Sequence, residues 1–187
     1  MATPLPTKRW TRLQYDRLIV CGVFQPGDRI ELIGGELIVS EPQRTPHATA
    51  IELALDALRA AFGPGWRVRV QLPVALDEES EPEPDIAVVP GSPRDYLPSH
   101  PSNPVLILEA AESSLALDRE IKGSLYARAQ IVDYWIVNLV DHVLEVYRDP
   151  EAAPASLVWL ALRLGHDAAR RRRRDSARGA PLSCCSS

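Results

Sequence analysis

The pattern of apolar and polar residues along the chain predicts three helices. Residues 45–63 give the clearest one, because Ile51, Leu55 and Leu58 share one helical face and Gly63 follows as a stop. Residues 11–22 predict a shorter helix that begins at a threonine and ends at a glycine. A third helix is expected from about 118 to 129.

Between these helices the pattern predicts strands. Two short apolar runs around Gly34-Gly35 indicate a hairpin over residues 29–40. Apolar and polar residues alternate along 66–76, which is typical of a strand exposed on one face. The continuous apolar runs at 85–89 and 104–111 are typical of central strands that are covered on both faces. Two final strands are predicted at 132–139 and 142–150. Together these elements predict an α/β fold with a mixed sheet and a helix on each side.

Composition and charge narrow the class of protein. The 187 residues suffice for one domain with a real core, and no apolar run approaches the length of a membrane span. Three cysteines without a disulfide or metal-ligand spacing, and a polar N-terminus unlike a signal peptide, favour a cytoplasmic setting. Residues 1–160 hold 14 basic and 23 acidic residues, since seven arginines follow residue 160. An acidic body argues against a dedicated DNA-binding module, although a local basic groove stays open.

Two acids stand at the ends of the predicted central strands. Asp85 leads into one apolar run and Glu109 ends the next. Each acid alone is most often a strand cap or an exit into solvent. If the two strands are neighbours, however, the carboxylates converge, repel each other and favour a hard cation. The pair therefore predicts a Mg²⁺ site, with Mn²⁺ as a substitute, that could activate water and polarise a phosphate.

Further candidate residues lie on the flanking elements. Asp118, Lys122 and Tyr126 follow one another at helical spacing on one face. The simplest interpretation is an exposed Asp–Lys pair; the alternative is that Lys122 reaches the carboxylates and stabilises charge on a phosphate. Two glutamates flank the hairpin glycines and a histidine begins the long helix, each a weak signal alone: Glu31, Glu36 and His47. The sequence has no HExxH, phosphate-binding glycine loop, GxSxG or zinc spacing.

Taken in order, these residues resemble the Uma2 family of restriction endonucleases. The resemblance runs from about residue 11 to 150 and rests on "RIELIGGELIVS", "EPDIAVV", "LILEAAESSLALDREIKGSLYARAQIVDYWIVNL" and "VLEVYRDP". It implies the PD-(D/E)xK nuclease fold, a restriction-endonuclease-like mixed sheet flanked by helices, and a Mg²⁺-dependent phosphodiesterase site. The residues that match the family are the metal-binding acids Asp85 and Glu109, the lysine Lys122, the additional acid Glu36, and the supporting residues His47, Asp118 and Tyr126.

The sequence departs from the standard nuclease signature at one position, and its C-terminal part differs from the rest of the chain. The standard signature has a lysine at the position of Ala111, so Lys122 would act from the helix instead. The nuclease domain is expected over residues 10–150, followed by an atypical basic, disordered tail at 151–187. The expected function is metal-dependent DNA endonuclease, often dimeric in the family, with no membrane partner. Two alternatives remain: an inactive nuclease-fold module that binds or scaffolds, and a hydrolase of small phosphoesters.

Overall fold

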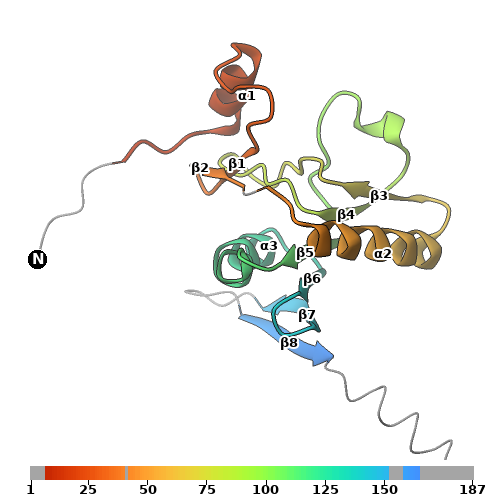
Figure 1. The fold of residues 1–187 in the computed structure, drawn as a ribbon. Helices are drawn as coiled ribbons and strands as arrows, with labels where there is room; N and C mark the ends of the chain where they lie inside the picture. The colour runs from red at the N-terminus through yellow and green to blue at the C-terminus, as the bar shows by residue number, and fades with distance from the viewer. Residues whose placement is uncertain (1–6, 41, 152–157, 165–187) are drawn as a thin grey trace, which may run out of the picture.

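The core of the fold is a six-stranded mixed sheet in the order β3-β4-β5-β6-β7-β8 (Figure 1). This computed structural model describes residues 7–40, 42–151 and 158–164. The strands are β3 (Trp66–Val70), β4 (Ile86–Pro90), β5 (Leu106–Ala111), β6 (Asp133–Asn138), β7 (Val143–Glu151) and β8 (Val158–Leu164). β5 and β6 run parallel, whereas the other neighbouring strands are antiparallel. The predicted α/β class with a mixed sheet is confirmed.

β4 and β5 lie at the centre of this sheet, as their apolar runs predict. Every residue of β5 and all but the last of β4 are buried. The two strands pair antiparallel, with Ile86 opposite Leu108. This register places Asp85, just before β4, level with Glu109 in β5.

One face of the sheet is covered by α2 (Thr45–Phe62), which carries a proline in its first turn and ends at Gly63. Ile51 and Leu58 of this helix are buried against apolar side chains of β3, β4 and β5. The amphipathic pattern of residues 45–63 therefore predicted both the helix and its buried face.

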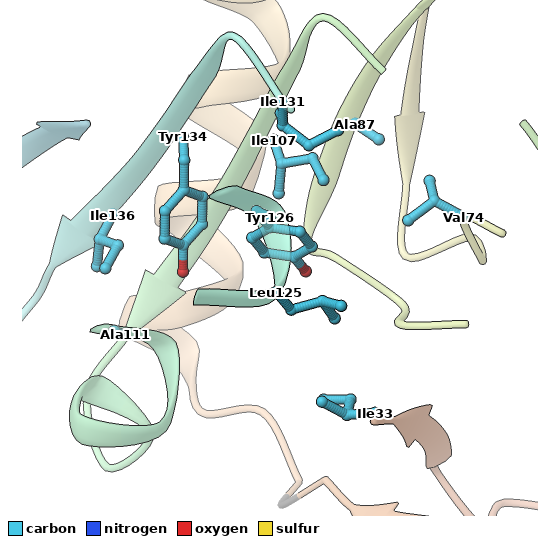
Figure 2. Close-up of a cluster of buried hydrophobic side chains, with 10 residues drawn as sticks. All are labelled: Ile33, Val74, Ala87, Ile107, Ala111, Leu125, Tyr126, Ile131, Tyr134 and Ile136. Atoms are coloured by element: carbon cyan, nitrogen blue, oxygen red, sulfur yellow. The ribbon is translucent and has the colours of Figure 1, made fainter. Parts of the chain in front are cut away.

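The opposite face is covered by α3 (Gly123–Arg128), with Tyr126 packed among β4, β5 and β6 side chains (Figure 2). The turn before it, η2 (Leu117–Lys122), is π-helical, whereas the sequence predicted an ordinary α-helix. Here the Asp118 carbonyl accepts from the Gly123 amide and also from the Tyr134 hydroxyl, at 2.9 Å. Such wider turns are frequent at functional sites.

The predicted hairpin and short helix are also present, at the end of the molecule away from β7 and β8 (Figure 1). α1 spans Arg12–Val20, and β1 (Ile30–Ile33) pairs with β2 (Glu36–Val39). Gly34 and Gly35 both have positive φ, 54° and 79°, which only glycine adopts without strain. A short 3₁₀ turn, η1 (Pro93–Tyr96), lies in the connection from β4 to β5.

The sheet continues past residue 150, the predicted end of the domain, because β8 pairs with β7 along its length. The remainder of the predicted tail, including its five consecutive arginines, lies outside the described residues. Among the described helices, none is long and apolar enough to cross a membrane.

Candidate active site

Asp85 and Glu109 meet at the adjoining ends of β4 and β5. The Asp85 amide donates to Glu109 Oε2 at 3.1 Å, and the Ala110 amide donates to Asp85 Oδ2 at 2.8 Å. These contacts link the two carboxylates to the ends of both central strands, and both residues are buried. The expected convergence of the two acids is therefore present.

Glu109 is held from its other side by the helical layer. Lys122 Nζ donates to Glu109 Oε1 at 3.1 Å and the Tyr126 hydroxyl donates to the same oxygen at 2.9 Å. Burial raises the pKa of Glu109 well above its usual range, Lys122 opposes this, and the neighbouring acids raise it further. The site thus concentrates more negative charge than its single lysine neutralises.

Lys122 lies among three buried carboxylates. Its Nζ is 3.2 Å from Glu31 Oε1, 3.1 Å from Glu109 Oε1 and 4.0 Å from Asp118 Oδ1. Burial disfavours the ammonium, but these carboxylates outweigh burial and raise the pKa of Lys122. The carboxylates therefore favour the charged form of Lys122 inside the acidic cluster. The simple surface-pair interpretation is wrong because both Asp118 and Lys122 are buried.

His47 approaches Asp85 from the first turn of α2. His47 Nε2 lies 2.9 Å from Asp85 Oδ2. This hydrogen bond raises the pKa of the imidazole, against the opposing effect of burial. On the other side, the Gln71 amide donates to the Asp85 carbonyl at 3.1 Å. Gln71 directly follows β3 and has a positive φ of 51°. His47 and Gln71 thus fix the position of Asp85.

These residues line one open pocket of about 310 Å³. Its walls come from the hairpin, the start of α2, the ends of β4 and β5, and η2. Predicted site residues in its lining are His47, Asp85, Glu109, Asp118 and Lys122. Tyr126 lies behind them, fully buried, where it contacts Glu109.

The hairpin supplies a different acid from the one predicted. Glu36 is exposed at the start of β2 and lines a separate groove beside Arg9 and Glu79. Glu31 of β1 is buried in the site instead, where it accepts from the Glu83 amide at 3.0 Å and faces Lys122. The prediction that Glu36 joins the cluster is wrong, because Glu36 follows the turn directly and stays outside the core.

Carboxylate oxygens are among the donors that a divalent cation such as Mg²⁺ prefers. Across the described residues, no group of three or more His, Cys, Asp or Glu side chains is arranged to hold a metal ion. Asp85 and Glu109 nevertheless provide carboxylate oxygens on one pocket wall, which suit Mg²⁺ or Mn²⁺. Burial and adjacent acids raise the pKa of Glu109, so a cation bound beside it would favour the charged form of this carboxylate.

Comparisons with known proteins place these observations in context. The family model Uma2, described as "Putative restriction endonuclease", matches residues 13–163. No match was found among curated proteins. A solved structure described as a putative nuclease belonging to DUF820, from Anabaena variabilis ATCC 29413, is similar with a TM-score of 0.59 and 17% identity. The similarity covers 79% of this chain and 87% of that one, and it supports the fold.

Proposed function

Because this chain belongs to the Uma2 family, a family of nuclease type, we propose that it is a metal-dependent endonuclease that hydrolyses DNA phosphodiester bonds. One observation carries the proposal: Asp85 and Glu109 are joined at the ends of two central strands, and Glu109 contacts the ammonium of Lys122. Acids that can hold a metal ion, beside a group that stabilises negative charge, are the parts that metal-assisted phosphodiester hydrolysis uses.

In this mechanism Asp85 and Glu109 would hold Mg²⁺, which when bound activates water and polarises the phosphate. The Ala110 amide and His47 orient Asp85, while Tyr126 orients Glu109. Lys122 lines the same pocket and supplies positive charge where the pentavalent phosphate develops its negative charge. Its position on η2 takes the place of the lysine that the standard signature has at Ala111.

A second candidate function is an inactive nuclease-fold module that binds without cleaving. The observation that favours it is the state of the carboxylates, whose oxygens already accept from protein donors. Asp85 accepts from Ala110 and Glu109 accepts from Lys122 and Tyr126. A cation would have to displace some of these donors, and a site that keeps them would remain inactive.

Nicking of supercoiled plasmid by the purified full chain, with Mg²⁺ or Mn²⁺ and with EDTA, tests the proposal. Wild-type protein is expected to nick only with metal, and Asp85→Asn and Lys122→Met are expected to abolish nicking. Asp56→Asn, an exposed acid on α2, is the matched control and should nick like wild type. Intact plasmid under all conditions would favour the inactive module, and cleavage of chromogenic phosphodiesters alone would favour a small-molecule hydrolase.

The proposal also covers the oligomeric state of the protein and its cellular compartment. A pair of sites suits cleavage of both DNA strands, so we propose a homodimer. Light scattering coupled to size-exclusion chromatography tests this. Cys21 is a free, exposed thiol, which suits the reducing cytoplasm proposed here.

A further inference from the structure

Charges in the pocket are segregated between its floor and its rim. The floor consists of buried acids, namely Glu31, Asp85, Glu109 and Asp118. Two arginines that the proposed mechanism does not use, Arg29 and Arg44, also line the pocket, and neither is buried. The acidic floor favours binding of cations, whereas the guanidinium groups at the rim favour binding of anions such as phosphates.

Arg29 is half-buried immediately before β1. It lines the pocket together with Glu83 and His47, and its charge opposes the rise that burial causes in the pKa of Glu83. Arg29 is therefore a cation beside the pocket whose charge is available to a ligand.

Arg44 stands at the N-cap of α2, with 74% of its side chain exposed. Its Nη1 contacts Glu112 Oε1 at 3.1 Å, and Glu112 is itself 40% exposed. Exposed pairs of this kind contribute little stability, so a phosphate can replace Glu112 at small cost. Arginine also matches phosphate geometry through two parallel N–H donors.

We propose that Arg29 and Arg44 bind backbone phosphates that flank the bond at the pocket floor, so that the ligand is a polynucleotide strand rather than a small phosphodiester. This inference rests on the proposed function. A pocket of about 310 Å³ lies at the lower limit of small-molecule sites, so a longer strand must extend past its rim. The neighbouring phosphates of a strand must then lie at the rim, where these two arginines stand.

Salt-dependent binding of a short fluorescein-labelled DNA duplex, measured by anisotropy with Ca²⁺ in place of Mg²⁺, tests the proposal. We expect Arg29→Ala and Arg44→Ala each to weaken binding about tenfold and to reduce the slope of log K against log salt by about 0.9 between about 50 and 200 mM. Arg44→Lys, which keeps the charge, should keep the slope. Arg59→Ala is the matched control, because Arg59 is exposed in the last turn of the same helix, about 22 Å from Arg44.

Slopes for Arg29→Ala and Arg44→Ala equal to that of Arg59→Ala would overturn the proposal, as would a wild-type protein that does not bind the duplex. Thermal unfolding of each variant excludes a folding defect as the cause. Plasmid nicking separates this inference from the proposed function. If the arginine variants change the salt slope but the wild-type protein does not nick plasmid, the phosphate contacts of Arg29 and Arg44 are supported and the chain is the inactive module. If the protein nicks plasmid but the slopes are unchanged, the nuclease is supported and the proposed phosphate contacts are wrong.

Discussion

The amide of Asp85 donates to Glu109 Oε2 at 3.1 Å, so the backbone of one candidate ligand is fixed by the side chain of the other. The link exists because β4 and β5 pair in a register that sets residue 85 level with residue 109. A carboxylate used as a hydrogen-bond acceptor in this way remains ionised more readily than burial alone would allow. The arrangement therefore prepares two acids for a cation while holding the sheet end together.

Asp85→Asn should remove Mn²⁺ binding without unfolding the domain. The asparagine oxygen can still accept from the Ala110 amide, which donates to Asp85 at 2.8 Å, but the charge is lost. Removing a residue that only hydrogen-bonds to a metal ligand already lowers metal affinity by about 10- to 100-fold. Removing the charge of a ligand itself should therefore lower Mn²⁺ affinity by more than about 100-fold. Calorimetric titration with Mn²⁺ measures this. Undiminished Mn²⁺ affinity in the variant would show that the ion binds elsewhere.

Lys122→Met should make stability dependent on divalent metal. Without the ammonium, Glu31 and Glu109 face each other with no counter-charge, which should cost about 3 to 5 kcal/mol in EDTA. A divalent cation can replace that charge, so Mn²⁺ should raise the unfolding temperature of the variant more than that of wild type. Thermal unfolding with and without Mn²⁺ measures the difference.

Lys8→Met is the control for this experiment, because Lys8 is exposed and is the only other lysine of the sequence. Its unfolding temperature should match wild type with and without metal. If Mn²⁺ stabilises Lys122→Met no more than wild type, the cation and the lysine do not share the same carboxylates.

Much of the fold was predictable because its signals are local. The continuous apolar runs of β4 and β5 identified the central strands, and Gly34-Gly35 identified the hairpin, since both residues need positive φ. The π-helical turn Leu117–Lys122 was not predictable, because local spacing does not show that the Tyr134 hydroxyl donates to the Asp118 carbonyl from another strand.

The candidate site was predictable where acids follow apolar runs, as at Asp85 and Glu109. The hairpin acid was not, because Glu31 and Glu36 occupy similar positions beside the glycines and only packing distinguishes them. Glu31 is buried against Lys122, whereas Glu36 is exposed. Gln71 carries no sequence signal, since its role depends on a backbone turn after β3.

His47→Ala should destabilise the metal-free protein more at low pH than at high pH. The hydrogen bond to Asp85 raises the folded-state pKa of His47 above its usual value of 6.5, against burial. The resulting stability is complete below about pH 6.5 and disappears as pH rises through the folded-state pKa. Urea unfolding in EDTA should therefore show a loss of about 1 kcal/mol near pH 5.5 and less near pH 9.

His100→Ala provides the contrast for this measurement. Burial and Arg69 lower the pKa of His100, so this histidine destabilises the folded state as it gains a proton. His100→Ala should therefore raise the free energy of unfolding, relative to wild type, more at low pH than at high pH. This trend is opposite to the one expected for His47→Ala. Equal trends in the two variants would show that the Asp85 contact does not govern the titration of His47.

Glu145→Gln should destabilise the fold at neutral pH through a network separate from the pocket. Glu145 is completely buried on β7 and accepts from Arg119, Asn138 and Tyr147. Burial opposes its charge, but these donors prevail and lower its pKa to about 2. A group with a lowered pKa stabilises the fold above its unfolded-state value near 4.5, and that stability is lost as pH falls toward 2.

Urea unfolding of Glu145→Gln should therefore show a loss of about 2 to 3 kcal/mol at pH 7, because Arg119 loses its buried partner. The difference from wild type should shrink as pH falls below about 4.5, since wild type then begins to protonate Glu145. Glu120→Gln, an exposed acid on η2, is the matched control and should lie within about 0.5 kcal/mol of wild type at each pH. A loss in Glu145→Gln that stays constant from pH 7 down to pH 3 would mean that shape, and not the charge of Glu145, stabilises the contact between η2 and β7.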